Sequence, residues 1–230
     1  MFKYVISFSK NGYIKYTSHL DMVRMFKRAF RRSEILLQYS QGFNPHPKMG
    51  FAQPLSLGYA ADEEYIEFET RQEYDKSVLI DDLSGNMPSG IVLTGVGRVP
   101  DDARSLAASV VAANYTVYFP VPYYSYDFKV LVNEYLAQSE ILAEKKQKKT
   151  RMLKEVDIRS KIRSIDVAAD EDDKLKMELS ADCGSGSNLS PELVIKTFTG
   201  FSEKMNCERY EIEVTRNKLI LPGDYRIDWM

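Results

Sequence analysis

Apolar and polar residues alternate along the first positions of the chain and predict a β-strand over residues 2–9. A helix is expected to follow, from a cap at Ser18 to about Ser33, because apolar residues recur there every three or four positions. The apolar side of this helix consists of Met22, Phe26, Ala29 and Phe30. Residues 38–54 are rich in glycine and proline, so we expect mostly loop with a short extended piece near residues 49–52.

The same pattern continues along the rest of the chain and predicts a repeated order of elements. The first half adds strands at 65–69 and 91–96 and a helix at 74–83; the second half has strands at 115–119, 174–180 and 208–215, an extended stretch at 156–167, and helices at 126–146 and from 191 to Gly200. Each half reads as βαββαβ, which favours an α+β fold of two ferredoxin-like units with antiparallel sheets. The expected domains are residues 1–100 and 101–230.

Composition limits the classes of protein to which this chain can belong. It has 230 residues, 44% hydrophobic and 28% charged, with no apolar run long enough for a membrane span and no signal-peptide pattern at its start. We therefore expect a cytoplasmic protein without membrane contact. Cys183 and Cys207 have no CxxC spacing, and phosphate-loop, dinucleotide and cluster-binding motifs are absent, so no cofactor and no metal is predicted.

The predicted first helix carries a charged face beside a histidine. Its polar positions recur at steps of three or four and are Asp21, Arg24, Arg28, Arg31 and Arg32. One interpretation is a solvated face on which Asp21 pairs with an arginine. The other is an anion-binding face, in which the helix N-terminus at Ser18 and His19 supplies N–H groups and the arginines hold a phosphate.

The loop after this helix is unusually constrained for a surface loop. Pro45 and Pro47 flank His46 and restrict the backbone on both sides of it, which pre-orders the imidazole. Polar or aromatic neighbours in the same loop are Gln41, Phe43, Asn44 and Lys48. His46 either stabilises the turn or is presented for function, and with His19 it could serve acid–base chemistry, metal ligation completed by Asp21, or binding of a phosphate or base. Binding is the favoured option.

A basic segment at residues 145–163 is the third candidate. It contains Lys145, Lys146, Lys148, Lys149, Arg151, Lys154, Arg159, Lys161 and Arg163. Such a run is either a solvated surface or an electrostatic contact with an RNA backbone, and binding of the second kind falls steeply with salt. The formal net charge of −2 shows that any phosphate-binding surface must be local.

Several of these motifs together resemble a known bacterial family. They are FSK at 8–10, TSHLD at 17–21, the arginines of 28–32, YSQGFNPHPK at 39–48 and PLSLG at 54–58, with weaker similarity at PSGI (88–91), SLA (105–107), VDIR (156–159) and Arg216. The sequence is similar to the radical-SAM-linked family, domain of unknown function 2344. The resemblance implies a partner that performs radical S-adenosylmethionine (SAM) chemistry and a setting of RNA or ribosome metabolism; it implies no catalytic residues.

Three functions follow as predictions. The first is a non-catalytic accessory domain that binds a transfer or ribosomal RNA through Arg24, Arg28, Arg31, Arg32 and Lys48, with His19, Phe43, Asn44 and His46 contacting a base or sugar. The second is a metal-independent endoribonuclease that uses His19 and His46 as acid and base. The third is a protein-interaction module that docks the radical SAM partner and contacts no RNA. The first is the favoured prediction.

Overall fold

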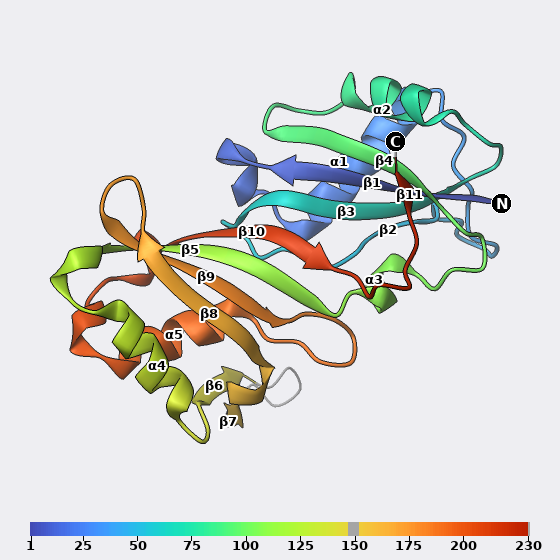
Figure 1. Ribbon diagram of the computed structural model, residues 1–230. Helices are drawn as coiled ribbons and strands as arrows, with labels where there is room; N and C mark the ends of the chain where they lie inside the picture. The colour runs from blue at the N-terminus through green and yellow to red at the C-terminus, as the bar shows by residue number, and fades with distance from the viewer. Residues whose placement is uncertain (147–151, 230) are drawn as a thin grey trace. The chain divides into compact units, whose positions relative to one another are not determined.

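The predicted first strand is present as β1 (Phe2–Lys10), which lies between β3 (Ala60–Thr70) and β4 (Ile91–Val99) and is antiparallel to both. The structure is a computed structural model that describes residues 1–146 and 152–229. Two units make up the chain, Met1–Val111 with Arg216–Met230 and Ala112–Thr215. The ribbon of each is drawn in Figure 1. The predicted boundary near residue 100 therefore differs from the observed one, and the chain returns to the first unit after residue 215.

The first unit is a mostly antiparallel sheet with two main helices. The short β2 (Met49–Phe51) pairs with β3, β11 (Asp228–Trp229) pairs with β4, and β10 (Glu213–Ile220) lies next to β3. The remaining elements of this unit are η1 (Gly12–Tyr16), α1 (His19–Arg32), α2 (Lys76–Ser84) and α3 (Leu106–Ser109). The predicted order of strands and helices over residues 2–99 is thus confirmed, and the assignment of the unit to the ferredoxin-like fold stays a prediction.

Alternate positions of β1 form the core of the first unit, as the pattern predicts. Tyr4, Ile6 and Phe8 are each at most 1% exposed and pack with the apolar side of α1. Phe26 of α1 lies 5.0 Å from Phe8 between ring centroids, and Leu79 of α2 completes the layer. The sheet face that carries these side chains is therefore covered by both helices, and burial of this apolar area stabilises the unit.

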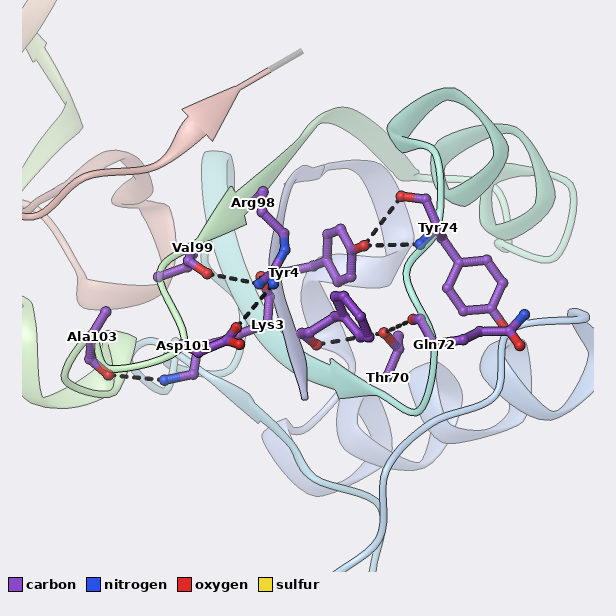
Figure 2. Close-up of polar contacts among 10 residues, drawn as sticks. Lys3, Tyr4, Thr70, Gln72, Tyr74, Arg98, Val99, Asp101 and Ala103 are labelled. Carbon is purple, nitrogen blue, oxygen red and sulfur yellow. Dashed lines mark hydrogen bonds and ion pairs between the residues drawn. The ribbon is translucent and has the colours of Figure 1, made fainter.

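Polar contacts connect the start of β1 to neighbouring segments, as Figure 2 shows. The hydroxyl of Tyr4 accepts from the Tyr74 amide at 2.9 Å and donates to its carbonyl at 3.1 Å. The Arg98 guanidinium donates to the carbonyl of Lys3 at 2.9 Å and pairs with Asp101 at 2.9 Å. These bonds satisfy polar groups at the start of β1, so they hold that end of the strand without leaving buried donors or acceptors unpaired.

In the second unit, β9 (Lys174–Asp182) lies between β5 (Ala112–Pro122) and β8 (Ile162–Ala169) and is antiparallel to both. A separate hairpin consists of β6 (Leu142–Lys146) and β7 (Leu153–Asp157). The helical elements are α4 (Phe128–Ala137), α5 (Pro191–Phe201), η2 (Tyr123–Ser125), η3 (Arg159–Lys161), η4 (Glu203–Met205) and η5 (Arg209–Glu211). Tyr135 of α4 packs edge-on against Phe198 of α5 at 5.2 Å, which joins the two main helices of the unit.

Two predicted elements of the second unit are wrong in part. The helix predicted for 126–146 ends at Ala137, and residues 142–146 pair in the β6–β7 hairpin. Lysine and glutamate favour helix locally, but the hairpin buries Ile141 and Ala143, and tertiary burial outweighs that weak propensity. The strand predicted for 208–215 begins only at Glu213, after the turn of η5. Within the described residues, no helix is long and apolar enough to cross a membrane.

Candidate functional site

Helix α1 presents its charged face to solvent, as the spacing predicts. Arg24, Arg28, Arg31 and Arg32 lie outside the core, whereas Met22 and Phe26 on the opposite side are buried. The helix starts as expected, because the Ser18 hydroxyl accepts from the Asp21 amide at 3.2 Å. A helix held by one apolar side thus displays an arginine face in a fixed orientation.

Asp21 is both a cap partner of Ser18 and an ion-pair partner of Arg24. Its carboxylate accepts from the Ser18 hydroxyl at 2.7 Å and pairs with Arg24 at 2.9 Å. These hydrogen bonds, first from Ser18 and then from Arg24, lower the pKa of Asp21. The ion pair with Asp21 accounts for Arg24, in agreement with the solvated-face interpretation. Arg28 and Arg32 have different surroundings.

Arg28 and Arg32 line a surface hollow beside α1. The other residues of the hollow come from η1, from α1 and from the loop that follows α2, and they are Ile14, Thr17, Asp21, Met25, Ala29, Gly85, Asn86, Met87 and Pro88. Two guanidinium groups one helical turn apart at a concave surface suit an oxyanion such as a phosphate, which accepts paired N–H donors. We refer to these residues as the arginine hollow.

His19 lies in a different environment from the arginines. It is the first residue of α1, it is partly buried, and its ring packs edge-on against Phe51 with centroids 5.3 Å apart. It lines a small cavity together with Phe8, Lys10, Met22, Phe51, Leu55 and Glu64. Burial, together with the positive charge of Lys10, lowers the pKa of His19, although Glu64 acts in the opposite direction. Relative to the unfolded chain, folding therefore favours the neutral imidazole of His19.

A cluster of buried charges that the sequence pattern did not predict borders this cavity. Lys10, Glu64 and Arg216 are 3%, 3% and 2% exposed. The Lys10 ammonium donates to the carbonyls of Lys15 and Thr17 at 3.3 and 3.1 Å, and burial lowers its pKa. The sequence contains one indication that Lys10 is buried. It continues the series of alternate positions in β1 that holds the buried Tyr4, Ile6 and Phe8.

Arg216 and Glu64 form the centre of the cluster. The Arg216 guanidinium makes a two-point ion pair with Glu64, with Nε 2.5 Å from Oε1. It also donates to the carbonyls of Gln53 and Pro54 at 2.9 and 3.3 Å. The pair therefore fixes the loop before Leu55 to β3 and β10, and with it one wall of the His19 cavity.

The proline-braced loop places its side chains on the surface. Residues 41–46 are all exposed, and the Phe43 ring is fully open to solvent. Ser40 holds the loop closed, since its amide donates to the His46 carbonyl at 2.8 Å and its hydroxyl accepts from the His46 amide at 2.9 Å. Gln41, Phe43, Asn44 and His46 thus stand on a rigid, exposed loop.

Lys48 forms an ion pair, and the first lysines of the basic segment lie in a strand. The Lys48 ammonium pairs with Glu69 at 2.8 Å, so a structural ion pair accounts for it. Lys145 and Lys146 lie on β6, whereas Lys148, Lys149 and Arg151 lie outside the described residues. The residues that line the His19 cavity do not include His46. Among the described residues, no group of histidine, cysteine, aspartate and glutamate side chains is arranged to hold a metal ion.

The motifs that build this site fall within one family model. The model, described as "Uncharacterized protein conserved in bacteria (DUF2344)", matches residues 3–191. The chain belongs to the DUF2344 family. The family match includes α1, the loop at 40–48, Lys10 and Glu64, and it stops before Arg216, to which the weaker sequence resemblance extends. No curated protein matches the chain.

As a DUF2344 protein, the chain gains no established activity from its family, so the chemistry of the site must come from its own residues. His19 is one of the residues that line a small cavity, and the arginine hollow offers two guanidinium groups at the surface. The His19 cavity is small and enclosed, whereas the arginine hollow is open to a large ligand. The arginine hollow is therefore the better candidate for a macromolecular anion.

The lowered pKa of His19 gives a testable dependence of stability on pH. The unfolded chain binds the His19 proton more tightly than the folded protein does, so stability is complete above the ordinary histidine pKa of about 6.5 and falls as the pH drops below it. We expect the melting temperature of His19→Asn to change less between about pH 7.5 and 5.5 than that of the wild type. Thermal melts followed by circular dichroism measure this, and parallel profiles would contradict it.

Proposed function

We propose that this protein binds RNA through the arginine face of α1, as a non-catalytic accessory domain of a radical SAM partner. The observation that carries the proposal is the arginine hollow, where Arg28 and Arg32 line a concave surface on a helix anchored from its other side. RNA affinity comes largely from phosphate contacts, for which fixed guanidinium groups are well suited. The resemblance to the radical-SAM-linked family supports the choice of partner.

The exposed loop at 41–46 adds groups that could contact a base or sugar. Phe43 and His46 project from a backbone that two prolines and the Ser40 hydrogen bonds restrain, so little conformational entropy is lost when a ligand binds. Asn44 provides both a donor and an acceptor at the same place. The loop is thus pre-ordered for recognition, while the arginine face supplies the electrostatic attraction.

The test is the salt dependence of RNA binding by Arg28→Ala/Arg32→Ala. We expect the wild type to retain transfer or ribosomal RNA on a filter at low salt, with affinity that falls linearly on a log–log salt plot. The double variant should bind more weakly, and its slope should be smaller by about 0.7–0.9 for each phosphate that the variant no longer binds. The matched control is Arg71→Ala/Arg104→Ala, which removes two exposed arginines from the same unit and should bind like the wild type.

Two results would refute the proposal. One is the absence of RNA retention by the wild type at low salt; the other is equal binding by the Arg28→Ala/Arg32→Ala variant and its control. Co-purification of the radical SAM partner without RNA, at high salt, would instead support the protein-docking alternative. RNA cleavage in EDTA that disappears in His46→Ala would support the endoribonuclease alternative, for which the two histidines would have to act on one phosphate.

A further inference from the structure

Two exposed tyrosines stand on η1, next to the arginine hollow. Tyr13 is 95% exposed and Tyr16 is 62% exposed. A 3-10 helix has three residues per turn and rises about 2 Å per residue, so residues 13 and 16 project from the same side, about 6 Å apart along the axis. Their arrangement is therefore a pair of accessible rings rather than two unrelated surface positions.

The backbone under these rings is held in place. The Asn11 amide donates to the Gly90 carbonyl at 2.9 Å, and the Gly58 amide donates to the Lys15 carbonyl at 2.9 Å. Gly90 has a φ of +90°, and a Cβ there would lie 2.5 Å from the Asn11 carbonyl oxygen, so this contact requires glycine. The two hydrogen bonds fix η1 to the start of β4 and to the loop that contains the exposed Leu57.

The same element forms one side of the arginine hollow. Ile14 and Thr17 line the hollow together with Arg28 and Arg32. Tyr13 directly precedes Ile14 in the chain, and Tyr16 directly precedes Thr17. With three residues per turn, Tyr13 and Tyr16 project about 120° around η1 from the side that lines the hollow, so a strand held at the two guanidinium groups reaches the rings by following η1. The combination of positive charge and exposed aromatic faces is the one that single-strand binders use for backbone and bases.

We propose that Tyr13 and Tyr16 stack on unpaired bases, so that the ligand of this surface is single-stranded RNA, such as a loop or a free end. This inference rests on the proposed RNA binding and names its substrate class. In an A-form duplex the base faces are stacked on one another and unable to meet a side chain, whereas in a single strand they can lie against tyrosine rings. An acidic or apolar protein partner on the same rings is the competing occupant, and the experiment includes it.

The experiment measures binding of a labelled RNA of about 12 nucleotides, within the site sizes of single-strand binders, and of the same strand annealed to its complement. Fluorescence anisotropy with the full chain should show tighter binding of the single strand. Tyr13→Leu/Tyr16→Leu should weaken single-strand binding by about tenfold or more and leave duplex binding unchanged. Tyr13→Phe/Tyr16→Phe keeps both rings and should bind like the wild type. Tyr124→Leu/Tyr210→Leu removes two other exposed tyrosines and serves as the matched control.

The outcomes separate this inference from the proposed function. Equal binding of single strand and duplex, with no effect of the leucine variant, overturns the stacking inference while RNA binding stands. Equal weakening of both ligands by the leucine variant also overturns it. If the leucine variant instead releases a protein partner that resists high salt without RNA, and keeps its single-strand binding, the rings belong to protein docking and the inference is overturned as well. No binding of either RNA refutes the proposed function itself.

Discussion

Replacing Arg216 by leucine is expected to lower the free energy of unfolding by about 3–5 kcal/mol, because it leaves Glu64 as a buried carboxylate without its ion-pair partner. Both side chains are nearly inaccessible, and the guanidinium also satisfies the carbonyls of Gln53 and Pro54. The substitution thus removes the ion-pair partner of a buried carboxylate and leaves two backbone acceptors without their donor. Urea denaturation of the full chain, followed by the fluorescence of Trp229, measures it.

A matched variant shows whether burial causes the effect of Arg216. Arg24 pairs with Asp21 at 2.9 Å, but both side chains are more than half exposed, so Arg24→Leu should cost less than about 1 kcal/mol. The double variant Glu64→Leu/Arg216→Leu removes both charges and should be more stable than Arg216→Leu alone. If Arg216→Leu loses no more stability than Arg24→Leu, the buried pair does not hold this part of the fold.

Phe26→Ala is expected to destabilise the protein by about 3–5 kcal/mol, the range for truncation of a buried phenylalanine. Phe26 is completely buried, and its ring lies 5.0 Å from that of Phe8 and 5.4 Å from that of Phe51. Its removal opens a cavity between α1, β1 and β2, on the side of α1 opposite the arginine face. The same urea denaturation measures the change.

Leu20→Ala is the control for Phe26→Ala, since Leu20 is on the same helix but 66% exposed. A change within about 0.5 kcal/mol is expected there, as for most surface substitutions. Comparable losses of stability for both variants would show that the packing of α1 on the sheet is not what stabilises the first unit. At temperatures where Phe26→Ala remains folded, it keeps every arginine of the face and should still bind RNA.

Local patterns were sufficient for the elements that carry the candidate site. The Ser18 cap, the apolar side of α1 and the exposed arginine face all follow from residues within one helix, because side chains three or four positions apart share a side. The loop at 40–48 was predictable for a similar reason, since proline restricts its own and the preceding residue. These parts of the site depend on neighbours in the chain.

Other features depended on contacts that no local pattern specifies. Residues 138–146 have helix-favouring side chains, yet pairing with β7 makes part of them a strand, because a strand is stabilised by a partner distant in the sequence. The hollow beside Arg28 and Arg32 likewise needs the loop after α2, which the fold brings to α1. Sequence periodicity identified the helix face but could not show that it borders a concave surface.

The sequence by itself determined the anchored, arginine-bearing helix and the rigid loop that follows it, since both arise from short-range backbone and side-chain preferences. Only the tertiary structure decided which charges are buried and which rings are exposed. Glu64 and Arg216 meet across the sheet of the first unit to satisfy each other, while Tyr13 and Tyr16 remain in water on η1. Burial depends on which distant segments cover a position, and that is settled only when the sheet and helices pack together.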